Sequence, residues 1–376
     1  MEVVRGISIN EIFQTNGNWL EFQKKFGSRI RPSVFVNVAK VFLCKTGFGY
    51  QEFTCPKSCG HSQRIPFTCK SRFCSPCGKV QTDNWCKKYE ATFLDVPYQH
   101  IVFTIPSLLW PIIQCNRQVG LNLLVKAAMQ TVLDYTKNTH GYTPAVMAVI
   151  HTFGRDLKFN THVHLLVSCG GLSKNKQKWI PNSYLHHKAL KTIWRTKIMA
   201  AFREQIPNIS SKLLNQAYSS AQDWYVHVGK KLGSAKKVVK YIGRYTKRPA
   251  IAQTRISSFE NNQVTFWYED HKEKQKINVT LSAQDFIKKL LPHIHDQNFK
   301  QIRYSGLLAP SIRTKALSTA RFLLGKGKAQ LWFIDSWRQR IKDLTDADPL
   351  ICPNCQVELQ KTATKFVSWR SIYGFT

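Results

Sequence analysis

Residues 161–167 form a short apolar run that carries two histidines. The run reads Thr161-His162-Val163-His164-Leu165-Leu166-Val167, and its β-branched and aliphatic residues predict a buried β-strand. Residues i and i+2 of a strand project from the same face, so His162 and His164 should emerge side by side. An imidazole is costly to bury without a partner, and two imidazoles on one rigid strand are suited to holding a metal ion. This run therefore predicts a sheet and a metal site on it.

A third histidine lies upstream of this run. Residues 146–150 predict another strand, which ends at His151, and Gly154-Arg155-Asp156 predicts the connection that follows. A hairpin there would place His151 beside His162 and His164 as a third metal ligand. The alternative for His151 is a core histidine satisfied by its neighbours. A second His-x-His pattern, at residues 293–295, follows a Leu-Pro step and runs into polar residues, which favours a loop over a ligand site.

Residues 234–247 predict a basic amphipathic helix, with Ser234 as N-cap and Pro249 marking its end. Tyr241 and Tyr245 are four residues apart, so they share a face at the border between a basic stripe and an apolar one. A phenol at this border can pack its ring on the core and present its oxygen to a basic cleft. Two ordinary core aromatics would have the same spacing. The basic stripe holds Lys237, Lys240, Arg244 and Arg248, and the apolar stripe holds Val238, Val239 and Ile242.

The charge of the chain is strongly unbalanced. Its 376 residues include 55 Lys and Arg against 22 Asp and Glu, a formal net charge of +33. A protein this basic repels itself unless a polyanion neutralises it, so nucleic acid is the expected partner. The longest apolar stretch, residues 100–113, is too short and too often interrupted to span a membrane, and we expect no signal peptide.

Six of the eleven cysteines lie between Cys44 and Cys77. This clustering suits metal binding in a reducing cytoplasm better than a disulfide framework. Two close pairs, Cys55 with Cys59 and Cys74 with Cys77, predict a structural zinc site in a basic, DNA-binding unit that folds around its metal. Alternative ligands, or ligands of a second ion, are Cys44, His61 and Cys69. Cys352 and Cys355 are either half of a zinc site completed from elsewhere or two reduced thiols.

The rest of the chain alternates strands and helices. Strands are expected over 98–105, 145–153, 162–168 and 224–228, helices over about 117–137 and 183–206, and more strands between 251 and 279. This order predicts an α+β protein with a ferredoxin-like antiparallel sheet and helices on one face. We expect three segments: an N-terminal helix and zinc-binding unit over 1–92, a catalytic unit over 93–300 and a basic C-terminal region over 301–376.

Several segments together carry a resemblance to a known family. They are Ser71-Arg72-Phe73-Cys74, residues 96–106, His151-Thr152-Phe153-Gly154, His162-Val163-His164, residues 241–249 and residues 303–310. With them the chain resembles the two-tyrosine HUH transposases of the insertion sequence ninety-one family, relatives of the Helitrons, which have an N-terminal transposase zinc-binding domain. The resemblance runs through most of the chain. The segment Tyr241-Ile242-Gly243-Arg244-Tyr245 is its most specific part.

The resemblance implies an HUH endonuclease fold and a DNA transposase that nicks and joins single strands through 5′-phosphotyrosine intermediates. It implies that Tyr241 and Tyr245 are the nucleophiles and that His162 and His164 bind a catalytic Mg²⁺ or Mn²⁺. His151 resembles the third histidine of conjugative relaxases. The implied partner is DNA, single-stranded or in hairpin transposon ends, in a bacterial cytoplasm near the nucleoid. Structural Zn²⁺ would be the second cofactor, and candidates for DNA contacts are Arg155, Lys240, Arg244, Lys247 and Arg248.

Other functions remain open at this point. A rolling-circle replication initiator or relaxase would use the same chemistry on different DNA. A non-catalytic zinc-finger regulator would bind DNA in a salt-sensitive way without nicking it, but it leaves the three histidines unexplained. A zinc hydrolase is disfavoured because no His-Glu-x-x-His motif lies near the histidine strand.

Overall fold

The computed structural model describes residues 6–57, 59–182, 184–220, 223–243, 249–270, 275–328 and 333–368. The chain divides into two compact units. Unit 1 comprises Met1–Lys87, Lys247–Ile294 and Trp332–Thr376, and unit 2 comprises Lys88–Thr246 and His295–Leu331. The C-terminal region expected over 301–376 is therefore shared between the two units.

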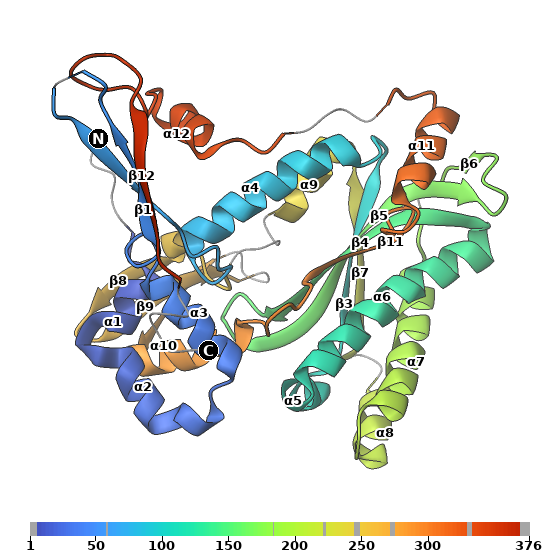
Figure 1. Ribbon diagram of the computed structural model, residues 1–376. Coiled ribbons are helices and arrows are strands. Elements are labelled where there is room, and N and C mark those ends of the chain that lie inside the picture. The colour runs from blue at the N-terminus through green and yellow to red at the C-terminus, as the bar shows by residue number, and fades with distance from the viewer. Residues whose placement is uncertain are drawn as a thin grey trace. The chain divides into compact units, whose positions relative to one another are not determined.

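Unit 2 is built on an antiparallel sheet with the strand order β11-β4-β5-β3-β7, and β6 pairs with β5 (Figure 1). Along the chain, β3, α6, β4, β5, α7 and β7 follow a β-α-β-β-α-β order, and their four strands lie in the order β4-β5-β3-β7. This is the ferredoxin-like arrangement, with β11 added beside β4, so the expected α+β fold is confirmed. The elements are β3 (Tyr98–Thr104), η3 (Ser107–Leu109), α5 (Trp110–Cys115), α6 (Arg117–His140), β4 (Tyr142–Phe153), β5 (Phe159–Ser173), β6 (Trp179–Ile180), α7 (His187–Gln205), α8 (Ser211–Ser219), β7 (Tyr225–Leu232), α9 (Ala235–Gly243), β11 (Ile302–Gly306) and α11 (Arg313–Leu323).

Helices α6 and α7 cover one face of this sheet (Figure 1). The residues of β3 and β5 that point toward them alternate with residues that point away, as the two-residue period of a strand requires. Ile101 and Phe103 of β3 and Val163 and Leu165 of β5 belong to the helix-side core. The histidines of β5 alternate along the strand with these core residues, so they lie on the opposite face of the sheet. The indole N–H of the fully buried Trp194 donates to the carbonyl of Thr104 at 3.0 Å, which ties α7 to the end of β3.

A glycine ends the long helix of unit 2 at the point where the chain must enter the sheet. Gly141 adopts φ 69° as the C-cap of α6, and its N–H donates to the carbonyls of Thr136 and Lys137. This left-handed conformation carries no penalty for a residue without Cβ. β4 starts at the next residue, so the 24-residue helix delivers the chain directly to the strand that carries His151.

Unit 1 contains two three-stranded antiparallel sheets, in the orders β12-β1-β2 and β10-β9-β8. Its first helix begins with a capping box, in which the Ser8 hydroxyl accepts from the backbone N–H of Glu11 and the Glu11 carboxylate accepts from that of Ser8. The helix α4 (Ser75–Thr92) starts in unit 1 and ends in unit 2. The other elements are α1 (Ile9–Gln14), η1 (Thr15–Gly17), α2 (Asn18–Phe26), η2 (Gly27–Arg29), α3 (Pro32–Phe42), β1 (Gly49–Thr54), β2 (Ser62–Pro66), η5 (Gln253–Arg255), β8 (Ile256–Glu260), β9 (Gln263–Glu269), β10 (Lys276–Ser282), α10 (Ala283–Leu290), η6 (Leu291–His293), α12 (Trp337–Thr345) and β12 (Gln360–Phe366).

Candidate active site

The hairpin of β4 and β5 brings three histidines together. His151 pairs directly with His162 across the hairpin, which confirms the expected hairpin, and His164 follows two residues later on the same face. One ring nitrogen from each of the three histidines lies within 4.8 Å of the others. His151 is 3% exposed and His164 7% exposed, while His162 is half-buried. The three imidazoles therefore form one cluster, of which His162 is the least buried member.

A backbone carbonyl orients His162. Its Nδ1 lies 2.9 Å from the carbonyl oxygen of Asn160. A carbonyl can only accept, so Nδ1 carries the proton and Nε2 keeps its lone pair. In metal-binding histidines, the ring nitrogen that does not bind the metal usually donates to a carbonyl or carboxylate in this way, which leaves the other nitrogen free to act as the ligand.

Burial favours the neutral forms of His162 and His164. Desolvation lowers the pKa of His162, and desolvation with the neighbouring His151, His162 and His100 lowers the pKa of His164 well below its ordinary value. A cation can be bound only by the neutral form of an imidazole. The donor set therefore fits a divalent metal ion with three nitrogen ligands.

Tyr241 reaches this cluster through a fourth histidine. The Tyr241 hydroxyl lies 3.2 Å from Nδ1 of His100, and Nε2 of His100 lies 2.8 Å from Nδ1 of His164. The rings of His100 and His164 are stacked, with centroids 5.0 Å apart. The phenolic oxygen is thus two hydrogen bonds away from a member of the histidine cluster. Burial lowers the pKa of His100 to about 4, so its ring is neutral at pH 7.

The helix α9 presents Tyr241 as its amphipathic pattern predicts. Val238, Val239 and Ile242 are buried, Lys240 is exposed, and Tyr241 is half-buried between them. Arg155 is exposed in the β4–β5 turn. Four expected site residues, Arg244, Tyr245, Lys247 and Arg248, lie outside the described residues.

His100 was not among the residues singled out from the sequence. Its signal is an imidazole inside Tyr98-Gln99-His100-Ile101-Val102-Phe103-Thr104, a segment that is otherwise mostly apolar. In β3 it shares a face with Val102, which pairs with His164. Because neighbouring positions across a sheet share a face, a correct strand order would have pointed to His100.

The cysteines form two clusters rather than the single expected quartet. Cys44, Cys69, Cys74 and Cys77 gather in one, and Cys55, Cys59, Cys352 and Cys355 in the other, with the four sulfurs of each within 4.8 Å of one another. The expected combination of Cys55 and Cys59 with Cys74 and Cys77 is therefore wrong. Both clusters lie in unit 1, and His61 is in neither.

The hairpin of β1 and β2 explains this division. Cys44 precedes β1 and Cys69 follows β2, so they lie at the open end of the hairpin, whereas Cys55 and Cys59 lie in its turn. The six residues of β1 span about 20 Å, which is too far for one ion to bind both ends. Antiparallel β12 starts opposite Thr54, so Cys352 and Cys355, just before β12, meet the turn.

Sulfur contacts within the clusters are short. Sγ of Cys77 lies 3.6 Å from Sγ of Cys69 and 3.8 Å from Sγ of Cys44, and Sγ of Cys59 lies 3.6 Å from Sγ of Cys352. Hydrogen bonds from the thiols of Cys44, Cys69 and Cys74 lower the pKa of Cys77 well below its ordinary range. Four sulfurs at such separations suit the tetrahedral shell of Zn²⁺. Each cluster thus supports a structural zinc site.

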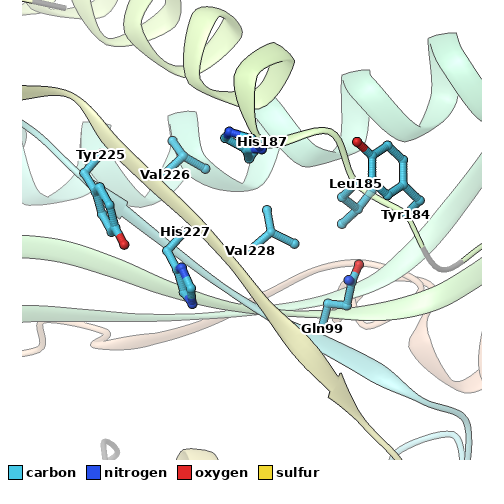
Figure 2. Close-up of a pocket in the computed structure, with 8 residues that line it drawn as sticks. All are labelled: Gln99, Tyr184, Leu185, His187, Tyr225, Val226, His227 and Val228. Carbon is cyan, nitrogen blue, oxygen red and sulfur yellow. The ribbon is translucent and has the colours of Figure 1, made fainter. Parts of the chain in front are cut away.

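A groove lies along strand β7. It is a cavity of about 430 Å³ lined by Gln99, Tyr184, Leu185, His187, Tyr225, Val226, His227 and Val228. Figure 2 shows Tyr225 and His227 on one side of β7, and Val226 and Val228 on the other side toward His187. The rings of Tyr225 and His227 are parallel, with centroids 6.2 Å apart, and Tyr225 is 54% exposed. In the pairing of β3 with β7, Tyr225 lies opposite Thr104, which in turn lies opposite His162. Tyr225 and His227 therefore share the sheet face of the histidine cluster.

Among the described residues, no helix is both long and apolar enough to cross a membrane.

Comparisons with known proteins agree with these features. Residues 145–316 match a family model described as "Putative transposase", and residues 13–105 match a "Transposase zinc-binding domain". The transposase for insertion sequence element IS801 of Pseudomonas savastanoi pv. phaseolicola is 29% identical over 375 residues, which cover 94% of this chain and 89% of that protein. Putative transposase y4qJ of Sinorhizobium fredii is 27% identical over 376 residues, 93% of each chain. No solved structure matches. The chain therefore belongs to the insertion sequence ninety-one family of transposases and carries that family's N-terminal zinc-binding domain.

Proposed function

We propose that this transposase cuts and rejoins single DNA strands through a covalent link between Tyr241 and a 5′-phosphate. The observation that carries the proposal is the chain of contacts from the Tyr241 hydroxyl through His100 to His164 of the histidine cluster. A phenol beside a cluster of imidazoles combines a nucleophile with a cation site, the two groups that phosphodiester cleavage needs.

His151, His162 and His164 would hold the catalytic ion, Mg²⁺ or Mn²⁺. The ion would supply Lewis-acid charge at a non-bridging oxygen of the scissile phosphate. Imidazole suits Mn²⁺ better than Mg²⁺, and oxygen atoms of the phosphate and of water would complete the shell of either ion. The contact of His162 with Asn160 keeps the ligand nitrogen directed and unprotonated.

In the cleavage step, the Tyr241 oxygen attacks phosphorus and loses its proton to solvent. The bond between phosphorus and the 3′ oxygen breaks, and that oxygen takes up a proton to give a 3′-OH. The product is a 5′-phosphotyrosine, which keeps the energy of the phosphodiester, so a second 3′-OH can displace the tyrosine without ATP. Tyr245, the second tyrosine of the motif, would hold another strand end in the same way.

Single-stranded DNA fits the exposed rings beside the cluster. Tyr225 and His227 lie on the same sheet face as His162 and His164, two strands away, or about 10 Å at ordinary strand spacing. Aromatic rings bind unpaired bases of any sequence by stacking, and basic residues bind the phosphates. Exposed Lys240 and Arg155 are suited to phosphate contacts, and the net charge of +33 attracts the polyanion.

The two cysteine clusters support a structural role for zinc. Each would hold one Zn²⁺ and fold the small sheet β12-β1-β2 around it. Basic residues around the first cluster, such as Lys45 and Arg72, support a role of this unit in recognising the ends of the element.

The test is to incubate the protein with Mn²⁺ and a single-stranded oligonucleotide from the end of the element, then to separate covalent adducts on a denaturing gel. We expect an adduct with the 5′ side of the cut that is lost in the double variant Tyr241→Phe/Tyr245→Phe. Tyr218→Phe, which alters an exposed phenol on α8, is the matched control. An adduct that survives in the double variant contradicts the assignment of the nucleophiles, and tight binding without any adduct would favour a non-catalytic regulator.

A further inference from the structure

We propose that His100 is a positioning residue that couples the metal site to the nucleophile: it holds the ring of His164 and donates a hydrogen bond to the oxygen of Tyr241. This inference rests on the proposed function and deepens it. His100 is buried in β3, between the strand that carries His164 and the edge strand β7.

Register places His100 at this point. Val102 of β3 pairs with His164 of β5, and His100 is two residues earlier on the same face. From there the two nitrogens of its ring face different partners, Nε2 toward Nδ1 of His164 at 2.8 Å and Nδ1 toward the Tyr241 hydroxyl at 3.2 Å. A ring with both nitrogens engaged in this way has little rotational freedom.

The chemistry of the two contacts decides which atoms carry protons. His164 can bind a metal ion through Nε2 only if Nε2 is unprotonated, so its neutral ring carries the proton on Nδ1. Nδ1 of His164 then donates to Nε2 of His100. Because Nε2 of His100 accepts, a neutral His100 carries its own proton on Nδ1 and donates it to the Tyr241 oxygen. Metal binding by His164 thus fixes the direction of both hydrogen bonds: His164 donates to His100, and His100 donates to Tyr241.

This direction excludes His100 as the base that removes the phenolic proton, because its nitrogen toward Tyr241 already carries a proton. It makes His100 a donor to the oxygen that becomes negatively charged when the phenol is deprotonated and again when phosphotyrosine is displaced. A donor directed at developing charge in a buried site favours the charged state over the neutral one. His100 would therefore assist both cleavage and rejoining while it orients a metal ligand.

Amide side chains can separate the two contacts. The carboxamide of glutamine reaches the place of Nε2 and can accept from His164, whereas the carboxamide of asparagine lies near Nδ1 and can donate to Tyr241. Three variants, His100→Ala, His100→Gln and His100→Asn, are compared with His140→Gln and His140→Asn, which alter a histidine at the end of α6. Circular dichroism first establishes that each variant is folded.

Two readouts are needed. Mn²⁺ affinity, measured by electron paramagnetic resonance without DNA, reports on the contact with His164. The rate of adduct formation at saturating Mn²⁺ reports on the contact with Tyr241. We expect His100→Ala to weaken Mn²⁺ binding by about 10- to 100-fold, the usual effect of removing a hydrogen-bond partner of a metal-binding histidine. His100→Gln should keep most of the Mn²⁺ affinity but form adduct slowly, and His100→Asn should show the reverse.

Folded His100 variants with wild-type Mn²⁺ affinity and wild-type adduct rates would overturn the inference, as would equal losses of both properties in the glutamine and asparagine variants. The metal readout does not depend on cleavage. A wild-type protein that binds Mn²⁺ but forms no adduct would therefore contradict the proposed function, while the effect of His100→Ala on Mn²⁺ affinity still decides whether His100 orients the site. A wild-type protein that binds no divalent ion would overturn both.

Discussion

The proposed C-terminal zinc ligands allow a test of how unit 1 is held together. Cys352 and Cys355 meet Cys55 and Cys59, almost 300 residues away in the chain, in one cluster of four sulfurs. We expect the double variant Cys352→Ser/Cys355→Ser to lose one of two zinc ions and to release strand β12 from β1. The first cluster shares no residue with the second, so it should keep its zinc.

The free energy that holds β12 against β1 can be estimated from the exposure of β12. All seven of its residues are exposed, so burial of apolar surface contributes little to holding the strand. Fixing the backbone of these residues costs about 7–14 kcal/mol, and the hydrogen bonds of its six register pairs with β1 return about 3–9 kcal/mol. The deficit of several kcal/mol is smaller than the roughly 10–16 kcal/mol that a structural zinc site contributes. Without its zinc, β12 should therefore separate.

Metal analysis and amide hydrogen exchange measure the two effects. Zinc content should fall from two ions per chain to one, and protection of residues 360–366 should be lost while that of the β4–β5 hairpin is retained. Cys115→Ser, which alters an exposed cysteine in neither cluster, is the control. A double variant that keeps two zinc ions, or one that keeps protected β12 amides after losing a zinc, would refute this reasoning.

Three further predictions concern DNA binding and pH. Tyr225→Ala should weaken binding of an oligothymidine by about 1–3 kcal/mol, measured by fluorescence anisotropy, whereas Tyr225→Phe keeps the ring and should bind normally; equal affinities would contradict base stacking. Arg155→Gln and Lys240→Gln should each reduce the slope of log affinity against log salt by about 1, and unchanged slopes would remove them from the DNA interface. In the metal-free protein, folded His100 has a pKa of about 4 against about 6.5 when unfolded, so the folded state binds fewer protons. Its contribution to the free energy of unfolding is thus constant above pH 6.5 and falls by about 3 kcal/mol as the pH drops to 4. His100→Gln should flatten this part of the pH profile measured by urea denaturation, and a profile as steep as that of the wild type would contradict the assignment.

The sheet of unit 2 could be predicted because its signals are local. The apolar run around His162 and His164, the turn at Gly154 and the period of α6 each depend on neighbouring residues. Once two strands are joined by a short turn, their register follows from which residues must face the core. The approach of His151 to His162 was predictable for the same reason.

The division of the cysteines was not predictable in this way. Spacing along the chain shows which cysteines can share a turn, but not which turns meet. Cys55 and Cys59 are completed by Cys352 and Cys355 because β12 pairs with β1, a long-range contact that exposed, polar β12 does not signal. The role of His100 was not predictable for a related reason. A single histidine in a strand has no other site residue near it in the sequence. The contacts of His100 can be foreseen only when β3 is known to lie between β5 and β7.

The proposed metal ligands and the proposed nucleophile need different degrees of rigidity, and they lie on different elements of the fold. The proposed metal ligands lie on β4 and β5, which are hydrogen-bonded to neighbouring strands on both sides, as is β3 with His100. Ligand nitrogens must hold their separation to a few tenths of an ångström, and paired inner strands provide that rigidity. The proposed nucleophile has another requirement, because in the proposed mechanism the tyrosine attached to DNA must release its strand to a second 3′-OH. Tyr241 lies on α9, a short helix that follows edge strand β7, and its hydroxyl contacts the paired inner strands at His100. Amide exchange should therefore be slow in β3, β4 and β5 and faster in α9, and equal protection of both would count against this division of roles.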